Sequence, residues 1–162
     1  MTRIRIAVGS DHAAVTMKDG IAQYLRGAGA DVDDVGTAGT DSVDYPDFAR
    51  LVGDKVAGGQ ARLGILLCGT GIGVAISANK IPGIRAAVCH DVTTARLARE
   101  HNDANVLCIG ARTTGATVAM DIVRTFLEAQ FEGGRHQRRL DKITELESRS
   151  RAAAGSGKEV PR

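Results

Sequence analysis

The sequence predicts an α/β protein, a three-layer α/β/α sandwich in which helices cover both faces of a five-stranded parallel sheet. Short apolar runs and helical patterns alternate five times along the chain. Such alternation is typical of a parallel sheet built from right-handed crossovers. The central run, Gly64 to Cys68, is apolar or small at every position, as expected for a strand that is buried on both faces.

The expected elements follow one another closely. In the first helix Ala13, Met17, Ile21 and Leu25 recur at i+4, which predicts one apolar face. Asp91 is expected to cap a later helix, and the second strand is polar enough to lie near an edge of the sheet. Strands are expected over residues 4–8, 31–35, 64–68, 85–89 and 106–110.

The composition is that of a globular domain. Of the 162 residues, 43% are hydrophobic and 25% are charged, and the net charge of +2 is too small to indicate nucleic-acid or membrane binding. Three cysteines without Cys-x-x-Cys spacing predict reduced thiols and a cytoplasmic protein. We expect no signal peptide and no membrane span. A single domain should cover residues 1–150, with a last helix over about 135–150 and a disordered tail over 152–162.

A glycine turn follows the central strand. Glycines at positions 69, 71 and 73 lead into a helix that begins near Val74, so unpaired backbone N–H groups and the positive end of the helix dipole face outward. Such a turn binds an anion or a developing oxyanion. Cys68 stands at the last position of the strand, and a helix N-terminus stabilises a thiolate that can act as base or nucleophile.

Other glycine motifs fit less well. A nucleotide-hydrolase phosphate loop needs Lys-Ser/Thr after the last glycine, where this chain has Val74-Ala75. A dinucleotide fingerprint needs a glycine at Val74, although Asp91 lies about 20 residues further on, where a ribose-binding acid would stand. A dinucleotide-binding oxidoreductase therefore stays an alternative, as does a turn with no ligand.

Further polar residues are expected at the same edge of the sheet. Asp11 and His12 follow the first strand, Cys89-His90 the fourth and Arg112 the fifth, and ligands bind at the carboxyl ends of parallel strands. Asp11 could instead simply cap the first long helix. Cys89 and Cys108 are assigned to the core.

Two other constellations have competing interpretations. Arg135 and Arg139 lie one helical turn apart and could clamp a phosphate, or belong to a solvated face or a nucleic-acid patch. The low charge and the aromatic content of 3% argue against nucleic acid. Cys68, Cys89, His90 and His101 could together coordinate a zinc ion. The sequence lacks the close-spaced ligand pairs that are typical of zinc sites, so we expect no metal.

Six blocks of the sequence together carry a resemblance to a known family. They are Gly9 to Ala13, Cys68 to Gly73, Ala78 to Lys80, Arg99 to Asn105, Ile109 to Arg112 and Arg135 to Arg139. In these blocks the chain resembles the type B ribose-5-phosphate isomerase family and its galactose-6-phosphate isomerase relatives, from about residue 3 to residue 147. The resemblance implies a Rossmann-like sandwich, an aldose–ketose isomerase of the pentose phosphate pathway, and homodimers with sites at the interface, with tetramers left open. It also implies a sugar-phosphate substrate and no metal or redox cofactor.

The resemblance also implies roles for individual residues. Cys68 would move a proton between C1 and C2, and His101 would open the furanose ring as an acid. The N–H groups of Gly69, Thr70, Gly71, Ile72 and Gly73 would hold the enediolate oxygen. Sugar hydroxyls would be contacted by Asp11, Thr70 and Asn102 beside a pocket-lining Tyr45, and the phosphate by His12, Arg112, Arg135 and Arg139.

Two positions depart from the family pattern. Ala14 replaces a usual glycine, and Thr93 stands where many members have an aromatic residue. A smaller side chain at position 93 could change the pocket, so a four-, five- or six-carbon sugar phosphate could fit, among them erythrulose 4-phosphate and allose or galactose 6-phosphate.

Overall fold

The computed structural model describes residues 3–155 and contains the expected parallel sheet. Its strands lie in the order β2-β1-β3-β5-β4, and every pair is parallel. β2 is an edge strand, as its polar sequence predicts. The strands are β1 (Arg5–Ser10), β2 (Asp31–Asp34), β3 (Leu63–Cys68), β4 (Ala86–Val88) and β5 (Val106–Gly110).

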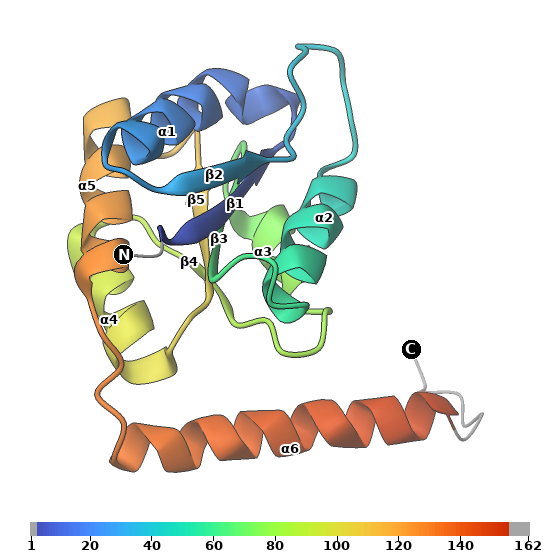
Figure 1. The fold of residues 1–162 in the computed structure, drawn as a ribbon. Helices are drawn as coiled ribbons and strands as arrows, with labels where there is room; N and C mark the ends of the chain where they lie inside the picture. The colour runs from blue at the N-terminus through green and yellow to red at the C-terminus, as the bar shows by residue number, and fades with distance from the viewer. Residues whose placement is uncertain (1–2, 156–162) are drawn as a thin grey trace. The chain divides into compact units, whose positions relative to one another are not determined.

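Helices cover both faces of the sheet, which confirms the three-layer prediction (Figure 1). One face packs against α1 (Val15–Gly27), α4 (Val92–Asn102) and α5 (Ala116–Glu128), and the other against α2 (Tyr45–Ala57) and α3 (Ile72–Ala78). Successive strand residues alternate between the two cores. Ile65 and Leu67 face α1 and α5, whereas Leu66 and Cys68 face α2 and α3.

The strand order creates a switch point between β1 and β3. From β1 the chain proceeds to β2 on one side, and it returns through α2 to β3 on the other side. A crevice opens at the carboxyl ends of such strands. Ser10 lies in register with Leu67, and Cys68 with Gly110, so three strand ends meet at this edge.

The chain divides into two compact units, one through Phe131 and one from Glu132 onward. The second unit contains α6 (Arg135–Gly155), which begins where the last helix was expected and continues five residues beyond position 150. Residues 156–162 of the expected tail lie outside the described residues. No helix within residues 3–155 is long and apolar enough to cross a membrane.

Candidate active site

Cys68 ends the central strand with its thiol against the glycine turn. The side chain is buried, and its Sγ accepts a hydrogen bond from the backbone N–H of Gly71 at 3.1 Å. Gly71 has a φ of 76°, in the left-handed region that favours glycine. A Cβ at this position would lie 2.9 Å from the carbonyl carbon of Ile109, so the turn packs directly on β5. The thiol is thus held by a backbone donor whose position only glycine allows.

The hydrogen bonds of the turn refine the expected oxyanion cradle. The N–H of Gly71 is directed to the thiol, and the N–H of Ile72 donates to Thr70 Oγ1 at 3.3 Å. Within residues 70–73, the N–H groups of Thr70 and Gly73 are therefore those left to bind an oxyanion.

Tyr45 closes one side of the turn. It is the first residue of α2, and a Cβ at Gly73 would lie 2.6 Å from its ring carbon Cζ. Glycine at position 73 is thus required for the close approach of the ring. The tyrosine is 40% exposed, which leaves part of the ring open to a ligand.

Asp11 and His12 follow β1 at the same edge. Asp11 is buried, and its Oδ1 accepts a hydrogen bond from the N–H of Ala13 at 2.9 Å, so it caps the short 3₁₀ helix His12–Ala14. Asp11 is thus a capping residue, but of this short helix and not of α1, whose N-cap is Ala14. Its Oδ2 is left for another partner. His12 Nδ1 accepts a hydrogen bond from the Val43 N–H at 3.2 Å. In a neutral ring the proton then resides on Nε2, which becomes a donor.

Arg112 crosses the start of the glycine turn. Its N–H donates to the Gly69 carbonyl at 2.9 Å. A Cβ at Gly69 would lie 3.3 Å from its guanidinium. A cationic side chain thus lies against the start of the turn, where an anionic group of a substrate could be bound.

The other two cysteines are core residues, as expected. Burial raises the pKa of the Cys89 thiol to about 11; a hydrogen bond with Thr94 opposes this and the charge of Asp91 adds to it. Burial likewise raises the pKa of Cys108 well above its usual value. Both thiols are therefore neutral at physiological pH.

The four residues considered for zinc do not form one site. Cys68 packs on the side of α2 and α3, whereas Cys89 belongs to the core on the opposite face of the sheet. His101 lies at the far end of α4.

His101 and Asn102 lie at the amino ends of the strands, whereas Cys68 lies at the carboxyl end. α4 begins at the carboxyl edge and runs back, so its last turn lies beside the start of β4. There Arg85, one residue before β4, donates from Nε to the Asn102 carbonyl at 3.1 Å. Within one chain these two residues do not join Cys68, and their roles stay a prediction.

Arg135 and Arg139 both lie in the first turns of α6. This helix belongs to the second unit, and the phosphate-binding role of the two arginines stays a prediction.

The departures from the family pattern have different consequences. Ala14 is 2% exposed and belongs to the core with Ile21 and Leu25, so its methyl group is accommodated away from the site. Thr93 lies exposed in the first turn of α4, at the carboxyl edge. Position 93 is therefore the departure that can affect a ligand.

Two interactions near this end of the sheet were not predicted from the sequence, one made by Val43 and one by Lys18. Val43 belongs to a loop without a motif, and no signal in the sequence marks it as the partner of His12. Lys18 is 3% exposed, with its ammonium 2.7 Å from Asp19 and 2.6 Å from Asp34. Lys18 lies four residues after Ala14, so the helical period places its charge on the apolar face of the helix. A charge in this position could have indicated a buried ion pair.

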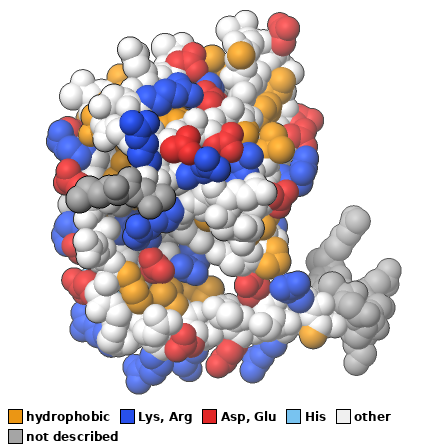
Figure 2. All heavy atoms as spheres, viewed as in Figure 1, with side chains coloured by type: hydrophobic (Ala, Val, Ile, Leu, Met, Phe, Trp, Pro, Cys, Tyr) orange, Lys and Arg blue, Asp and Glu red, His pale blue; other side chains and the backbone are white. Residues whose placement is uncertain are grey.

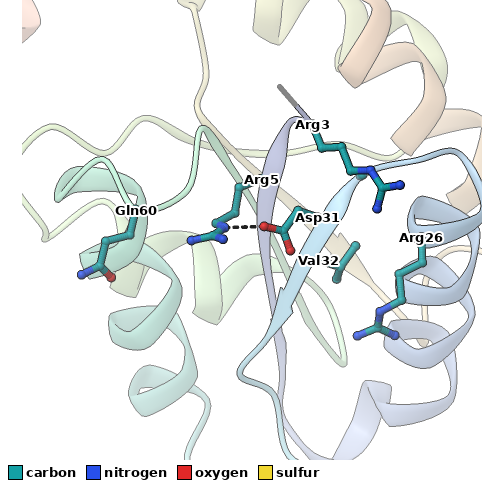
Figure 3. Close-up of a pocket in the computed structure, with 7 residues that line it drawn as sticks. Arg3, Arg5, Arg26, Asp31, Val32 and Gln60 are labelled. Carbon is teal, nitrogen blue, oxygen red and sulfur yellow. Dashed lines mark hydrogen bonds and ion pairs between the residues drawn. The ribbon is translucent and has the colours of Figure 1, made fainter. Parts of the chain in front are cut away.

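A cavity of about 740 Å³ lies at the amino edge of the sheet (Figure 3). Arg3, Arg5 and Arg26 line it, and Arg5 pairs with Asp31 at 2.7 Å. No cysteine or histidine of residues 3–155 lines the cavity, and it opens at the amino ends of the strands instead of their carboxyl ends. It is therefore not the candidate active site. On the face shown in Figure 2, basic and acidic side chains are interspersed over the first unit.

Comparison with known proteins decides which family these features represent. Residues 6–143 match the model of the ribose/galactose isomerase family. The chain belongs to this family. Ribose-5-phosphate isomerase B of Escherichia coli strain K12 is 48% identical over 145 residues, which cover 90% of this chain and 97% of that protein.

Solved structures of ribose/galactose isomerases have the same fold. Ribose-5-phosphate isomerase B of Clostridium thermocellum is 50% identical, with a TM-score of 0.90, and the match covers 91% of this chain and 99% of that one. The enzyme from Mycoplasma genitalium, solved with bound ribulose-5-phosphate, is 45% identical with a TM-score of 0.87 and the same coverage. The resemblance and the fold class inferred from the sequence are confirmed.

Proposed function

We propose that this chain is an aldose–ketose isomerase that interconverts ribose 5-phosphate and ribulose 5-phosphate. The observation that carries the proposal is the Cys68 thiol, held by the Gly71 N–H at the carboxyl end of β3 in a chain of the ribose/galactose isomerase family. The relatives named above act on five-carbon sugar phosphates by their names. Three free cysteines agree with a cytoplasmic enzyme.

The chemistry needs one base and a stabilised anion. In the open-chain aldose, the Cys68 thiolate removes the C2 proton and an enediolate forms. The thiol returns a proton to C1, while the hydroxyl proton moves from O2 to O1, so that the ketose results without net oxidation. We assign the contacts with the reacting oxygens to the N–H groups of Thr70 and Gly73 and to the Asp11 carboxylate. No redox cofactor enters this balance.

The phosphate requires cationic and donor groups near the same edge. Arg112 supplies a guanidinium, and His12 supplies an Nε2–H donor because Nδ1 is occupied by Val43. Bidentate guanidinium contacts favour a phosphate dianion. We assign Arg135 and Arg139 of α6 to the same group.

A second copy of the chain would complete the site. His101 and Asn102 lie at the edge opposite to Cys68, so they can serve the chemistry only from a partner. We infer a homodimer, and exposed apolar residues near the glycine turn support it. Ile72 and Ile76 lie one turn apart on α3 and are 52% and 59% exposed, which is typical of a surface covered by a partner.

A panel of four- to six-carbon aldose phosphates tests this function. We expect the highest kcat/KM with ribose 5-phosphate, no requirement for added metal, and loss of activity in Cys68→Ser. Preference for a six-carbon substrate would move the assignment to a galactose- or allose-phosphate isomerase and point to Thr93. The absence of turnover on the whole panel, with saturable binding of reduced nicotinamide dinucleotide, would favour the oxidoreductase alternative.

A further inference from the structure

The end of α4 has an unusual backbone. Asp103 follows the helix with a φ of 41°, and it is the one non-glycine residue with a positive φ in residues 3–155. Its N–H donates to the Arg99 carbonyl at 3.1 Å, and the Ala104 N–H donates to the Ala98 carbonyl at 2.9 Å. A side chain in this conformation is disfavoured unless the surroundings hold it.

The carboxylate of Asp103 is held between two guanidinium groups. Oδ2 lies 2.9 Å from Arg85 Nη2, and Oδ1 lies 2.7 Å from Arg99 Nη1. None of the three side chains is more than 34% exposed. Charge-assisted bonds of this kind hold their partners in a defined geometry.

Each arginine also holds the backbone around Asp103. Arg85 Nε donates to the carbonyls of Asn102 and Asp103, at 3.1 and 2.9 Å. Arg99 donates to the Ala104 carbonyl at 2.7 Å and lies 5.6 Å from the centroid of the buried Phe126 ring. The two guanidinium groups thus tie the end of the helix to the sheet and to α5.

Asn105 completes the connection to β4. Its Oδ1 accepts from the Arg85 N–H and its Nδ2 donates to the Gly83 carbonyl, both at 2.8 Å. The segment from Arg99 to Asn105 is therefore fixed at both ends. His101 and Asn102 stand between these fixed points.

We propose that Asp103 is a positioning residue whose carboxylate, bridging Arg85 and Arg99, holds the last turn of α4 so that His101 meets the substrate in one orientation. The inference rests on the proposed function, in which His101 opens the sugar ring. Asp103 itself contacts no substrate, and its effect passes through His101.

Three variants separate the carboxylate from the backbone. Asp103→Gly keeps the positive φ and removes the bridge, Asp103→Ala removes the bridge and strains the backbone, and Asp103→Asn keeps one acceptor and the backbone preference. Arg96→Gln is the matched control, because it removes the ion pair with Glu100 on the same helix and leaves the Asp103 contacts intact. Thermal unfolding and the oligomeric state are measured for each variant.

Two readouts distinguish positioning from general damage. The first is kcat with ribose 5-phosphate, which must open its ring. The second is exchange of the C1 proton of ribulose 5-phosphate in deuterated water, because this ketose is phosphorylated on O5 and cannot close a furanose ring. Exchange therefore needs the Cys68 machinery and no ring opening.

We expect Asp103→Gly to lower kcat at least about 10-fold, since misplacing a catalytic group by about an ångström costs up to about 100-fold. Its exchange rate should stay near that of the wild type, Asp103→Asn should be intermediate, and Arg96→Gln should be unchanged in both. Wild-type turnover in both Asp103→Gly and Asp103→Asn would overturn this inference and leave the proposed function intact. A parallel fall of turnover and exchange would do the same. A wild type that shows neither turnover nor exchange would overturn the proposed function and this inference together.

Discussion

The backbone N–H of Gly71 lies 3.1 Å from the Sγ of Cys68 and donates to it. A donor in this position stabilises negative charge on sulfur, as do the first N–H groups of a helix. Because the turn places this donor three residues after the thiol, the strand end and the glycine turn act as one unit. This relationship is the basis of the proposed catalytic base.

Cys68→Ser should abolish most of the turnover while the fold persists. A serine hydroxyl is far too weak an acid to act as base at neutral pH, so we expect kcat to fall at least about 100-fold. Exchange of substrate C–H protons with deuterated water should fall with it. Steady-state kinetics and proton NMR measure both effects, and thermal unfolding checks the fold.

Iodoacetamide should inactivate the wild type, and substrate should protect it. Cys108→Ser is the control, because it should act through stability by placing a hydroxyl in an apolar core. Near-normal kcat and exchange in Cys68→Ser would make the thiol a packing residue, and Asp11 would become the first candidate for the base.

Gly71→Ala should damage both stability and activity. The left-handed φ alone costs about 1–2 kcal/mol for a residue with a Cβ, and the methyl group would also press on the backbone of Ile109 and Gly110. Gly59→Ala is the matched control, since Gly59 has a φ of 72° and no atom within 4 Å of the added Cβ. We expect Gly59→Ala to lose about 1 kcal/mol of stability and to keep its kcat. Equal kcat in both variants would show that the conformation of the glycine turn does not contribute to catalysis.

The stability of the protein should fall between pH 9 and pH 11 in a way that depends on Cys89. Burial raises the pKa of this thiol to about 11, so the unfolded chain loses its proton at lower pH than the folded protein. Ionisation therefore favours unfolding as the pH rises through this window, by about 2–3 kcal/mol in all. Urea denaturation of Cys89→Ser should lack this part of the decline. Parallel pH curves for the two proteins would contradict the prediction.

Lys18→Met should destabilise the fold by about 2 kcal/mol, because two charge-assisted hydrogen bonds are lost. Burial lowers the pKa of Lys18, but the hydrogen bonds and charges of Asp19 and Asp34 outweigh it and raise the pKa above 10.5. The contribution is thus complete below pH 10.5 and is lost as the pH rises through the folded-state pKa. Lys55→Met, which removes a more exposed pair with Asp33, should cost under about 1 kcal/mol. Equal losses in urea denaturation would show that burial of Lys18 adds nothing.

Arg135→Ala and Arg139→Ala should each raise KM about 10-fold or more with little change in kcat. A charge-assisted contact with phosphate contributes roughly 1.5–3 kcal/mol and is similar in ground and transition states. Arg138→Ala, on the same helix, serves as the control in the same steady-state assay. An unchanged KM in the double variant Arg135→Ala/Arg139→Ala would show that this helix face is solvated surface.

Much of the fold and part of the site could be predicted from local patterns. The apolar run that ends at Cys68 predicts a buried parallel strand, and the following glycines predict its turn, because both depend on neighbours in the sequence. The face of the first helix was less well predicted. The periodic set of Ala13, Met17, Ile21 and Leu25 points to one face, but the buried residues include Lys18, because its carboxylate partners come from another element as well as its own.

The sequence by itself determined the sheet, its central thiol and the family, because periodicity, turn residues and ordered motifs are local properties. Only the tertiary structure decided which groups meet. It pairs His12 with Val43 and Asp103 with Arg85, contacts that span 31 and 18 positions. It also places His101 at the edge of the sheet opposite to Cys68, because α4 must run back along the sheet before β5 can join it in parallel. Such distances depend on how the elements pack, and no local pattern carries that information.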